Sequence, residues 1–156
     1  MKIYTLKKVQ VLPIDMDECW NFFSNPANLE LITPPDLSLA VKSELPEQMY
    51  PGMIIEYTVS PLLGIKQTWV TEITHVKKPF YFADEQRFGP YKFWHHQHHF
   101  KKTKDGHIEA TDIVNYSLPF DPFSRLIHDL FIAKQLNYIF EYREGVLNKK
   151  FGNISP

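Results

Sequence analysis

The C-terminal stretch from residue 123 to about residue 151 constrains the fold most, because it is long enough to form one helix and too apolar to stand alone. It contains no proline, and its only internal glycine before the end is Gly145. Apolar residues recur along it at helical spacings, namely Ile127, Leu130, Phe131, Phe140, Val146 and Leu147. One helix of this length would run for about 40 Å. It needs a broad apolar surface to pack against, and only a sheet formed by the rest of the chain can supply one.

The region from residue 37 to residue 118 is the candidate for that sheet, because short runs of β-forming residues follow one another between turn signals. The predicted strands are 37–41, 54–59, 65–73, 80–88, 91–102 and 108–118, and another precedes them at 3–11. The predicted links include 46–52, 60–64, 77–79, 89–90 and the hairpin pair Asp105-Gly106. Strands joined by links this short predict an antiparallel meander rather than βαβ units.

Two short helices are predicted between the first strand and the remaining strands. Asp15 precedes Glu18 by three residues, which is the spacing of a capping box at a helix start. Ser24-Asn25-Pro26 interrupts this helix, and residues 27–32 form a second short helical segment. Residues 1–156 therefore predict a single α+β domain. It consists of a curved antiparallel sheet of about six or seven strands, two short helices after the first strand and one long C-terminal helix.

The composition excludes several classes of function. The net charge is −1 and the pI about 6.6, so no basic excess favours a nucleic-acid partner. No apolar run approaches the roughly 20 residues of a membrane-spanning helix. Cys19 is the only cysteine, and the first residues lack the apolar core of a signal peptide. We therefore predict a cytoplasmic protein without membrane insertion, present as a monomer or weak homodimer.

Several segments carry a resemblance to a known family. They are Phe23-Ser24-Asn25-Pro26, Ile32-Thr33-Pro34-Pro35, Trp69-Val70-Thr71-Glu72-Ile73, Phe82-Ala83-Asp84-Glu85-Gln86, Trp94-x-His96-x-His98-x-Phe100, Asp112-x-Val114-x-Tyr116-x-Leu118-Pro119 and Phe140-Glu141-Tyr142-Arg143. In this order the chain resembles the helix-grip fold of the START and Bet v 1-like superfamily, also called SRPBCC. It is most similar to a bacterial ligand-binding branch often labelled "cell division inhibitor". The resemblance implies a cavity between sheet and last helix that holds an apolar or amphipathic small molecule. It implies no one activity, because the superfamily includes lipid carriers, hormone receptors and cyclases.

Four histidines surround Gln97 within one predicted strand, and alternation divides them between its two faces. One face carries Trp94, His96, His98 and Phe100, and the other carries Phe93, His95, Gln97 and His99. Two large aromatic side chains bracket the histidines of the first face, so we predict that this face lines the cavity. Phe93 makes the other face partly apolar too, which leaves the assignment open.

A His-x-His pair on a strand can direct two imidazoles at one metal ion. A third ligand would come from a neighbouring strand, and the candidates are Asp84, Glu85, Asp112 and Glu56. Alternatively, the histidines hydrogen-bond to nearby acids and line a polar part of the cavity. We favour this alternative and predict no cofactor, because His-x-His alone is a pattern of low specificity. If a metal ion binds, His96 and His98 are its predicted ligands.

Acidic residues on otherwise apolar strands form a second group of candidates. Asp84 and Gln86 share one strand face with Phe82, and Asp112 shares another with Tyr116. Buried acids need partners, and His96 or His98 on the strand between could supply them in an Asp–His–Asp network. Such a network has shifted pKa values suited to acid–base catalysis, or it only fixes the sheet register and orients a ligand. We favour the second interpretation.

The remaining candidates come from the long strand at 65–73 and from the last helix. Gln67, Trp69 and Thr71 give a mixed face suited to an amphipathic ligand, whereas a single tryptophan such as Trp69 somewhat more often only fills the core. Arg143 pairs with an acid or a ligand carboxylate, or is solvated, as such arginines more often are. The full predicted ligand-binding set is Gln67, Trp69, Thr71, Phe82, Asp84, Gln86, Trp94, His96, His98, Asp112, Tyr116 and Arg143.

Three functions are compatible with the sequence. The leading one is binding of a small apolar or amphipathic molecule, such as a lipid or hydrophobic metabolite. The second is an enzyme of the cyclase or hydratase type that moves protons through His96, His98, Asp84 and Asp112. We favour binding over catalysis, because the aromatic content of 15% is high and the strand faces mix apolar and polar residues. No motif for a serine or cysteine nucleophile is present, so a mechanism of that kind has no support. The third is a partner-binding scaffold that uses residues 46–52 or 120–123 as an apolar contact.

Overall fold

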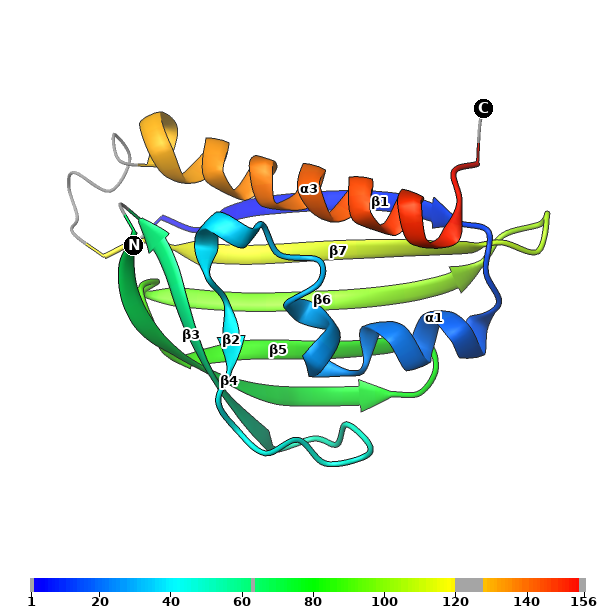
Figure 1. Cartoon of the computed structure of the whole chain (residues 1–156), viewed down its shortest axis with the longest axis horizontal. Coiled ribbons are helices and arrows are strands. Elements are labelled where there is room, and N and C mark those ends of the chain that lie inside the picture. Colours follow the sequence, from blue (N-terminus) through cyan, green and yellow to red (C-terminus); the bar gives the residue numbers. More distant parts are fainter. Residues whose placement is uncertain (1, 63, 120–127, 155–156) are drawn as a thin grey trace.

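The computed structural model describes residues 2–62, 64–119 and 128–154. Its elements in chain order are β1 (Tyr4–Leu12), α1 (Met16–Phe23), the 3₁₀ helices η1 (Pro26–Leu29) and η2 (Pro35–Leu37), β2 (Ala40–Val41), β3 (Met53–Leu62), β4 (Ile65–Lys77), β5 (Tyr81–Phe88), β6 (Phe93–Lys102), β7 (Ile108–Ser117), the π-helical turn η3 (His128–Ile132) and α3 (Ala133–Phe151). The strands form one curved sheet, which the helices cover on one face (Figure 1). The predicted α+β helix-grip architecture is therefore confirmed.

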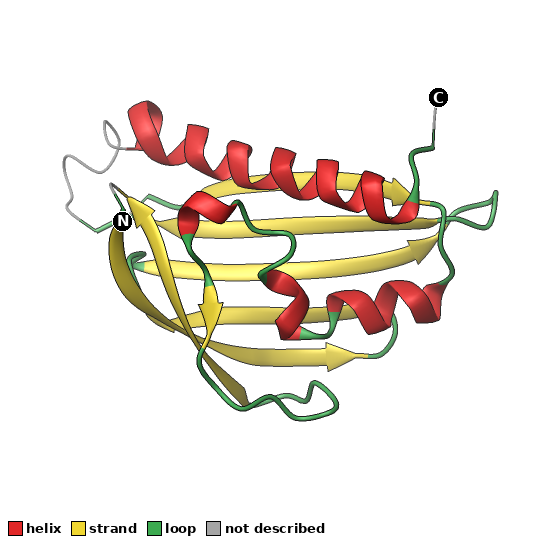
Figure 2. Ribbon diagram, viewed as in Figure 1, coloured by secondary structure: helices red, strands yellow, loops and turns green. Residues whose placement is uncertain are grey.

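All strand pairs of the sheet are antiparallel, in the order β1-β7-β6-β5-β4-β3-β2. Consecutive strands from β2 to β7 are neighbours, as the short links predicted, and β1 closes onto β7. Gly106 has a φ of 88° at the predicted hairpin between β6 and β7, a conformation that glycine adopts without strain. Register shifts interrupt the ladders between β3 and β4 and between β4 and β5. The sheet as a whole is curved around the helices (Figure 2).

The helix α1 begins where the capping signal predicted. The side chain of Asp15 accepts a hydrogen bond from the backbone N–H of Glu18 at 2.8 Å. Cys19, Trp20 and Phe22 face inward, and the ring of Trp20 meets Phe82 edge to face. These contacts belong to an apolar cluster in which α1 packs on the sheet and on the end of α3. Aromatic burial thus fixes α1 over β5 and β6.

Three segments between β1 and β4 differ from the predictions. The second short helix is a 3₁₀ turn, η1, and not a segment reaching residue 32. The predicted strand 37–41 shrinks to the two residues of β2, because Leu37 ends the 3₁₀ helix η2 and Ser38 has a left-handed φ of 47°. The predicted turn at 60–64 is shorter, since β3 continues to Leu62.

The long helix α3 packs along β1 and β7, and its buried side chains define the face that meets the sheet (Figure 1). That face carries Leu136, Phe140, Arg143 and Leu147, and it continues into η3 at Ile132. Leu130 and Phe131, predicted to face the core, are instead 48% and 59% exposed. The predicted helix start at residues 123–127 lies outside the described residues.

Candidate ligand-binding cavity

A cavity of about 180 Å³ lies between the sheet, α3 and the α1–η2 region. Its wall is predominantly apolar, with side chains from β3, β4, β5 and β6, from α3 and from the short helical segments. For scale, an apolar cavity of roughly 150 Å³ inside a protein stays dry and admits benzene. The space is therefore large enough for a small apolar group.

Eight of the predicted ligand-binding residues lie in the wall of this cavity. They are Trp69, Thr71, Phe82, Asp84, Trp94, His96, His98 and Arg143. Seven of them come from the neighbouring strands β4, β5 and β6, where alternation turns one face of each strand toward α3, and Arg143 comes from α3 itself. The rings of Trp69 and Trp94 meet edge to face, with centroids 5.2 Å apart.

The other four predicted residues lie outside the wall. Gln86 braces the β5–β6 turn, since its amide donates to the carbonyl oxygen of Tyr91 at 2.7 Å and accepts from its N–H at 3.2 Å. Tyr116 is buried under α3, where its hydroxyl lies 2.9 Å from Nε2 of His128. Gln67 is half-buried on β4. Asp112 lies behind the histidines and faces a smaller pocket next to β1 and α3.

Two histidines and two aspartates form a compact polar cluster in the otherwise apolar interior. His96 donates from Nε2 to Asp112 Oδ1 at 3.0 Å, and His98 donates from Nε2 to Asp84 Oδ2 at 3.1 Å. The second nitrogen of each ring faces the other acid. His96 Nδ1 lies 3.6 Å from Asp84 Oδ2, and His98 Nδ1 lies 2.8 Å from Asp112 Oδ1 in a geometry too bent for a hydrogen bond. Each ring is therefore held between a carboxylate on the cavity side and a carboxylate behind it.

Burial and mutual charge shift the pKa values of this cluster in different directions. Burial lowers the pKa of His96 below 6.5, and the neighbouring charge of His98 lowers it further. Burial also opposes protonation of His98, but contacts with Asp112 and Asp84 outweigh it and raise the pKa of His98 above 6.5. Burial alone would raise the pKa of Asp112, yet the two histidines hold it well below its usual 3.8. The two carboxylates therefore favour protonation of His98 over protonation of His96.

Arg143 brings a positive charge from α3 to the same cluster. The side chain is 7% exposed, and Nη1 lies 3.9 Å from Asp112 Oδ2. The guanidinium stacks over the ring of Phe140 at 4.7 Å, and its Nε has no hydrogen-bond partner among the described residues. Burial lowers the pKa of Arg143. The expectation that this arginine is more often solvated is wrong here, because α3 turns it toward Asp112.

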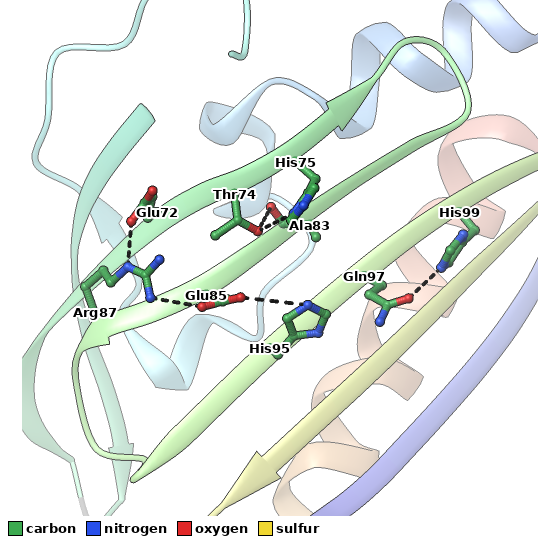
Figure 3. A network of polar contacts seen from close by, with 9 residues as sticks. All are labelled: Glu72, Thr74, His75, Ala83, Glu85, Arg87, His95, Gln97 and His99. Carbon is green, nitrogen blue, oxygen red and sulfur yellow. Dashed lines mark hydrogen bonds and ion pairs between the residues drawn. The ribbon is translucent and has the colours of Figure 1, made fainter. Parts of the chain in front are cut away.

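The other two histidines of β6 lie on the outer face of the sheet (Figure 3). His95 Nε2 is 3.9 Å from Glu85, which also pairs with Arg87, and His99 contacts Gln97 at 2.9 Å. Glu85, one candidate third metal ligand, is therefore on the wrong face to join His96 and His98. Glu56, another candidate, is an exposed residue of β3.

Several residues of the wall were not singled out from the sequence. Tyr57 lies beside Asp84, and burial together with that charge raises the pKa of its phenol. Tyr91, in the β5–β6 turn, is half-buried, and desolvation of its phenol raises its pKa. Leu136 and Phe140 close the wall from α3. The alternation of Ile55, Tyr57 and Val59 was the sequence signal for the β3 side of the wall.

Chemically, the cluster can hold a proton, orient a polar group or bind a cation. One ligand atom from each of Asp84, His96 and His98 lies within 4.8 Å of the other two. No helix among the described residues is long and apolar enough to cross a lipid bilayer.

No protein-family model matches the chain, and no curated protein matches it. Solved structures match over nearly its whole length. The protein TTHA0849 from Thermus thermophilus superposes with a TM-score of 0.71 at 14% identity, over 95% of this chain and 97% of that one. Ara h 8.0201 superposes with a TM-score of 0.61 at 15% sequence identity, over 95% of this chain and 99% of that one. Major latex-like protein 151 from Panax ginseng superposes with a TM-score of 0.60 at 18% sequence identity, over 92% of this chain and 96% of that one.

The last two of these are Bet v 1-like proteins. The chain has the Bet v 1-like helix-grip fold. The Bet v 1-like architecture predicted from the sequence motifs is therefore confirmed. At these sequence identities the similarity concerns the fold alone, and the ligand has to be inferred from the residues of the cavity.

Proposed function

We propose that this protein binds a small apolar or amphipathic molecule in the cavity between its sheet and α3. The observation that carries the proposal is a mainly apolar cavity of about 180 Å³ with a buried polar cluster in its wall. Apolar walls with a few convergent polar groups are typical of small-molecule sites. Binding of small hydrophobic ligands is also general among proteins of the Bet v 1-like fold, which supports the proposal.

The polar cluster gives the ligand an orientation in this proposal. Asp84, His98 and Arg143 line the cavity and offer both hydrogen-bond donors and acceptors, whereas the walls around Trp69 and Phe140 offer apolar contacts. An amphipathic molecule satisfies both kinds of surface, because its polar end replaces water at the cluster while its apolar part fills the rest.

Blocking the cavity tests the proposal. Val59 is buried on β3 and lines the cavity, so Val59→Phe fills part of it. Thr58→Phe places the same ring on the opposite face of β3 and is the matched control. We expect a fluorescent hydrophobic probe to bind wild type and T58F alike and to bind V59F at least tenfold more weakly. Equal binding by all three proteins contradicts the proposal.

Acid–base catalysis is the second candidate, and it is supported by the opposite pKa shifts of two adjacent histidines. A neutral His96 beside a protonated His98 is an arrangement that can accept and deliver a proton. If a turned-over substrate is found, His98→Gln should abolish turnover and leave apolar probe binding within about twofold of wild type. Turnover that survives in H98Q removes the basis of this candidate.

A further inference from the structure

The contacts inside the polar cluster leave two acceptor atoms facing each other. His96 donates its Nε2–H to Asp112, so in the neutral ring the Nδ1 carries a lone pair. That lone pair points toward Asp84 Oδ2, a carboxylate oxygen 3.6 Å away. Two acceptors at this distance repel each other unless a cation lies between them.

Both ring nitrogens of His98 face carboxylate oxygens. Its Nε2 lies 3.1 Å from Asp84 and its Nδ1 lies 2.8 Å from Asp112. A neutral ring has one N–H, so one of the two nitrogens must face a carboxylate with a lone pair. A second proton resolves this for His98 but not for His96. A single metal ion at Asp84 resolves both, because it takes the lone pairs of His96 Nδ1 and His98 Nε2, leaves His96 Nε2 to donate to Asp112 and leaves the protonated Nδ1 of His98 facing Asp112 at 2.8 Å.

The charge of the cluster also favours a cation. With both histidines neutral, the buried charges are those of Asp84, Asp112 and Arg143, which sum to −1, so either a proton on His98 or a metal ion is needed to compensate them. A buried net charge without compensation is costly. A divalent ion reverses the sign and leaves room for one anionic group, such as a bound hydroxide or the polar end of a ligand, on the cavity side.

We propose that Asp84, His96 and His98 form a site for one divalent transition-metal ion, with Asp112 as the carboxylate that orients both imidazoles. The ligands of a tetrahedral ion at about 2.0–2.1 Å lie roughly 3.3 Å apart. The observed separations of Asp84 Oδ2 from the two ring nitrogens, 3.1 and 3.6 Å, bracket that value. A carboxylate behind each ligating histidine is the usual support in metal sites.

Two nitrogens and one oxygen suit ions such as Zn²⁺ or Co²⁺ better than Mg²⁺ or Ca²⁺, which prefer oxygen ligands. All three ligating side chains line the cavity. The remaining coordination positions therefore face the bound molecule. The site goes beyond the proposed function, since metal binding does not depend on which apolar molecule occupies the cavity.

Titration of chelator-treated protein with Zn²⁺, followed by calorimetry, tests the site. We expect one ion per chain in wild type and at least a hundredfold weaker binding in Asp84→Asn and His98→Gln. Asp112→Asn should weaken binding by about 10–100-fold, as for other carboxylates that support ligating histidines. The matched control is the double variant His95→Gln/His99→Gln, which removes the histidines on the outer face of the same strand and should bind Zn²⁺ as wild type does.

Spectroscopy on the unaltered chain provides a second measurement that needs no variant to fold. Co²⁺ added to wild type should give the intense visible absorption of a tetrahedral or five-coordinate site, and X-ray absorption of the Zn²⁺-loaded protein should count two imidazoles. Absence of saturable 1:1 binding overturns the proposal. So does a loss of binding in H95Q/H99Q, or binding that persists in a folded D84N, because either result places the ion elsewhere on the protein.

Discussion

Leu136 offers a quantitative test of how the cavity selects its ligand. Its side chain is almost fully buried on α3 and forms part of the cavity wall. Leu136→Ala removes about three carbon atoms next to a space of about 180 Å³, so the cavity grows. Each additional buried methylene of a ligand contributes about 0.8 kcal/mol, or roughly fourfold in Kd.

In a series of straight-chain alcohols, affinity should rise by this factor per carbon until the cavity is full, and then stop rising. In L136A the break should come about three carbons later, because the removed atoms make room for them. The longest alcohols should then bind the variant about 2.4 kcal/mol more tightly than wild type, which is roughly sixtyfold in Kd. Alcohols are chosen because a neutral head group leaves the charge of the polar cluster unchanged.

Isothermal calorimetry, or displacement of a fluorescent probe, measures the series on both proteins. The control is Val114→Ala, because Val114 is completely buried in the same apolar cluster as Leu136 but does not line the cavity. L136A should lose about 2–3 kcal/mol of unfolding free energy, the lower end for such changes, since its side chain already borders a void. V114A should lose stability without moving the break.

Two results would refute this reasoning. If the break lies at the same chain length in L136A and wild type, Leu136 does not limit the space available to the ligand. If V114A moves the break as far as L136A does, general loosening of the core explains the effect and not the cavity wall.

Three further measurements follow from individual contacts. The free energy of unfolding should fall as pH rises above about 6.5, because the pKa of His98 is raised in the folded state and the folded protein therefore holds this proton more tightly than the unfolded chain does. Urea titration in the presence of a chelator measures it. His98→Gln should remove that fall. The Cys19 thiol is fully buried with a pKa raised to about 12, so a thiol reagent should label it only at the rate of unfolding. Gly89→Ala should lower the free energy of unfolding by about 1–3 kcal/mol in thermal denaturation, because the added Cβ would lie 2.5 Å from Gln86 Oε1 and displace the amide that braces Tyr91. In a protein that already carries Gln86→Ala, the additional Gly89→Ala substitution should cost less.

The sequence was most informative about the sheet, because a period of two residues fixes which side chains share a face. Trp94 and His96 point to the cavity and His95 to the outer face, as alternation on that strand predicted. Turn residues also located the strand ends, with errors of a few residues where a strand continues into its turn, as β3 does at Leu62. Nothing in the structure tests the predicted cytoplasmic location or oligomeric state, which stay predictions.

The orientation of the last helix could not be obtained in the same way. A π-helical turn precedes α3, and its wider turn shifts the phase of the side chains that precede it. Leu130 and Phe131 precede Leu136 by six and five residues, so at about 100° per residue even a regular helix would turn both away from the buried face, and both are exposed. The burial of Arg143 depends on how α3 is rotated about its own axis and on the carboxylate of Asp112, which β7 supplies. The residue pattern of the helix alone predicts neither.

The polar cluster depends on the pairing of three strands. Asp84 lies opposite His96 across β5 and β6, and Asp112 lies opposite His98 across β6 and β7. The two hydrogen bonds run along the diagonals, from His98 to Asp84 and from His96 to Asp112, so both acids reach both rings. A slip of one residue in either pairing would move an acid to the outer face.

The turns at the strand ends hold this pairing in place. The β6–β7 register is set by the hairpin containing Gly106, and the β5–β6 register by the turn that Gln86 clamps through both backbone groups of Tyr91. Gln86 was predicted to touch the ligand, yet its contacts fix the strand that presents Asp84 to His96 and His98. Its effect on the cavity is therefore exerted through register, so Gln86→Ala should loosen the cluster without removing any group from the cavity wall.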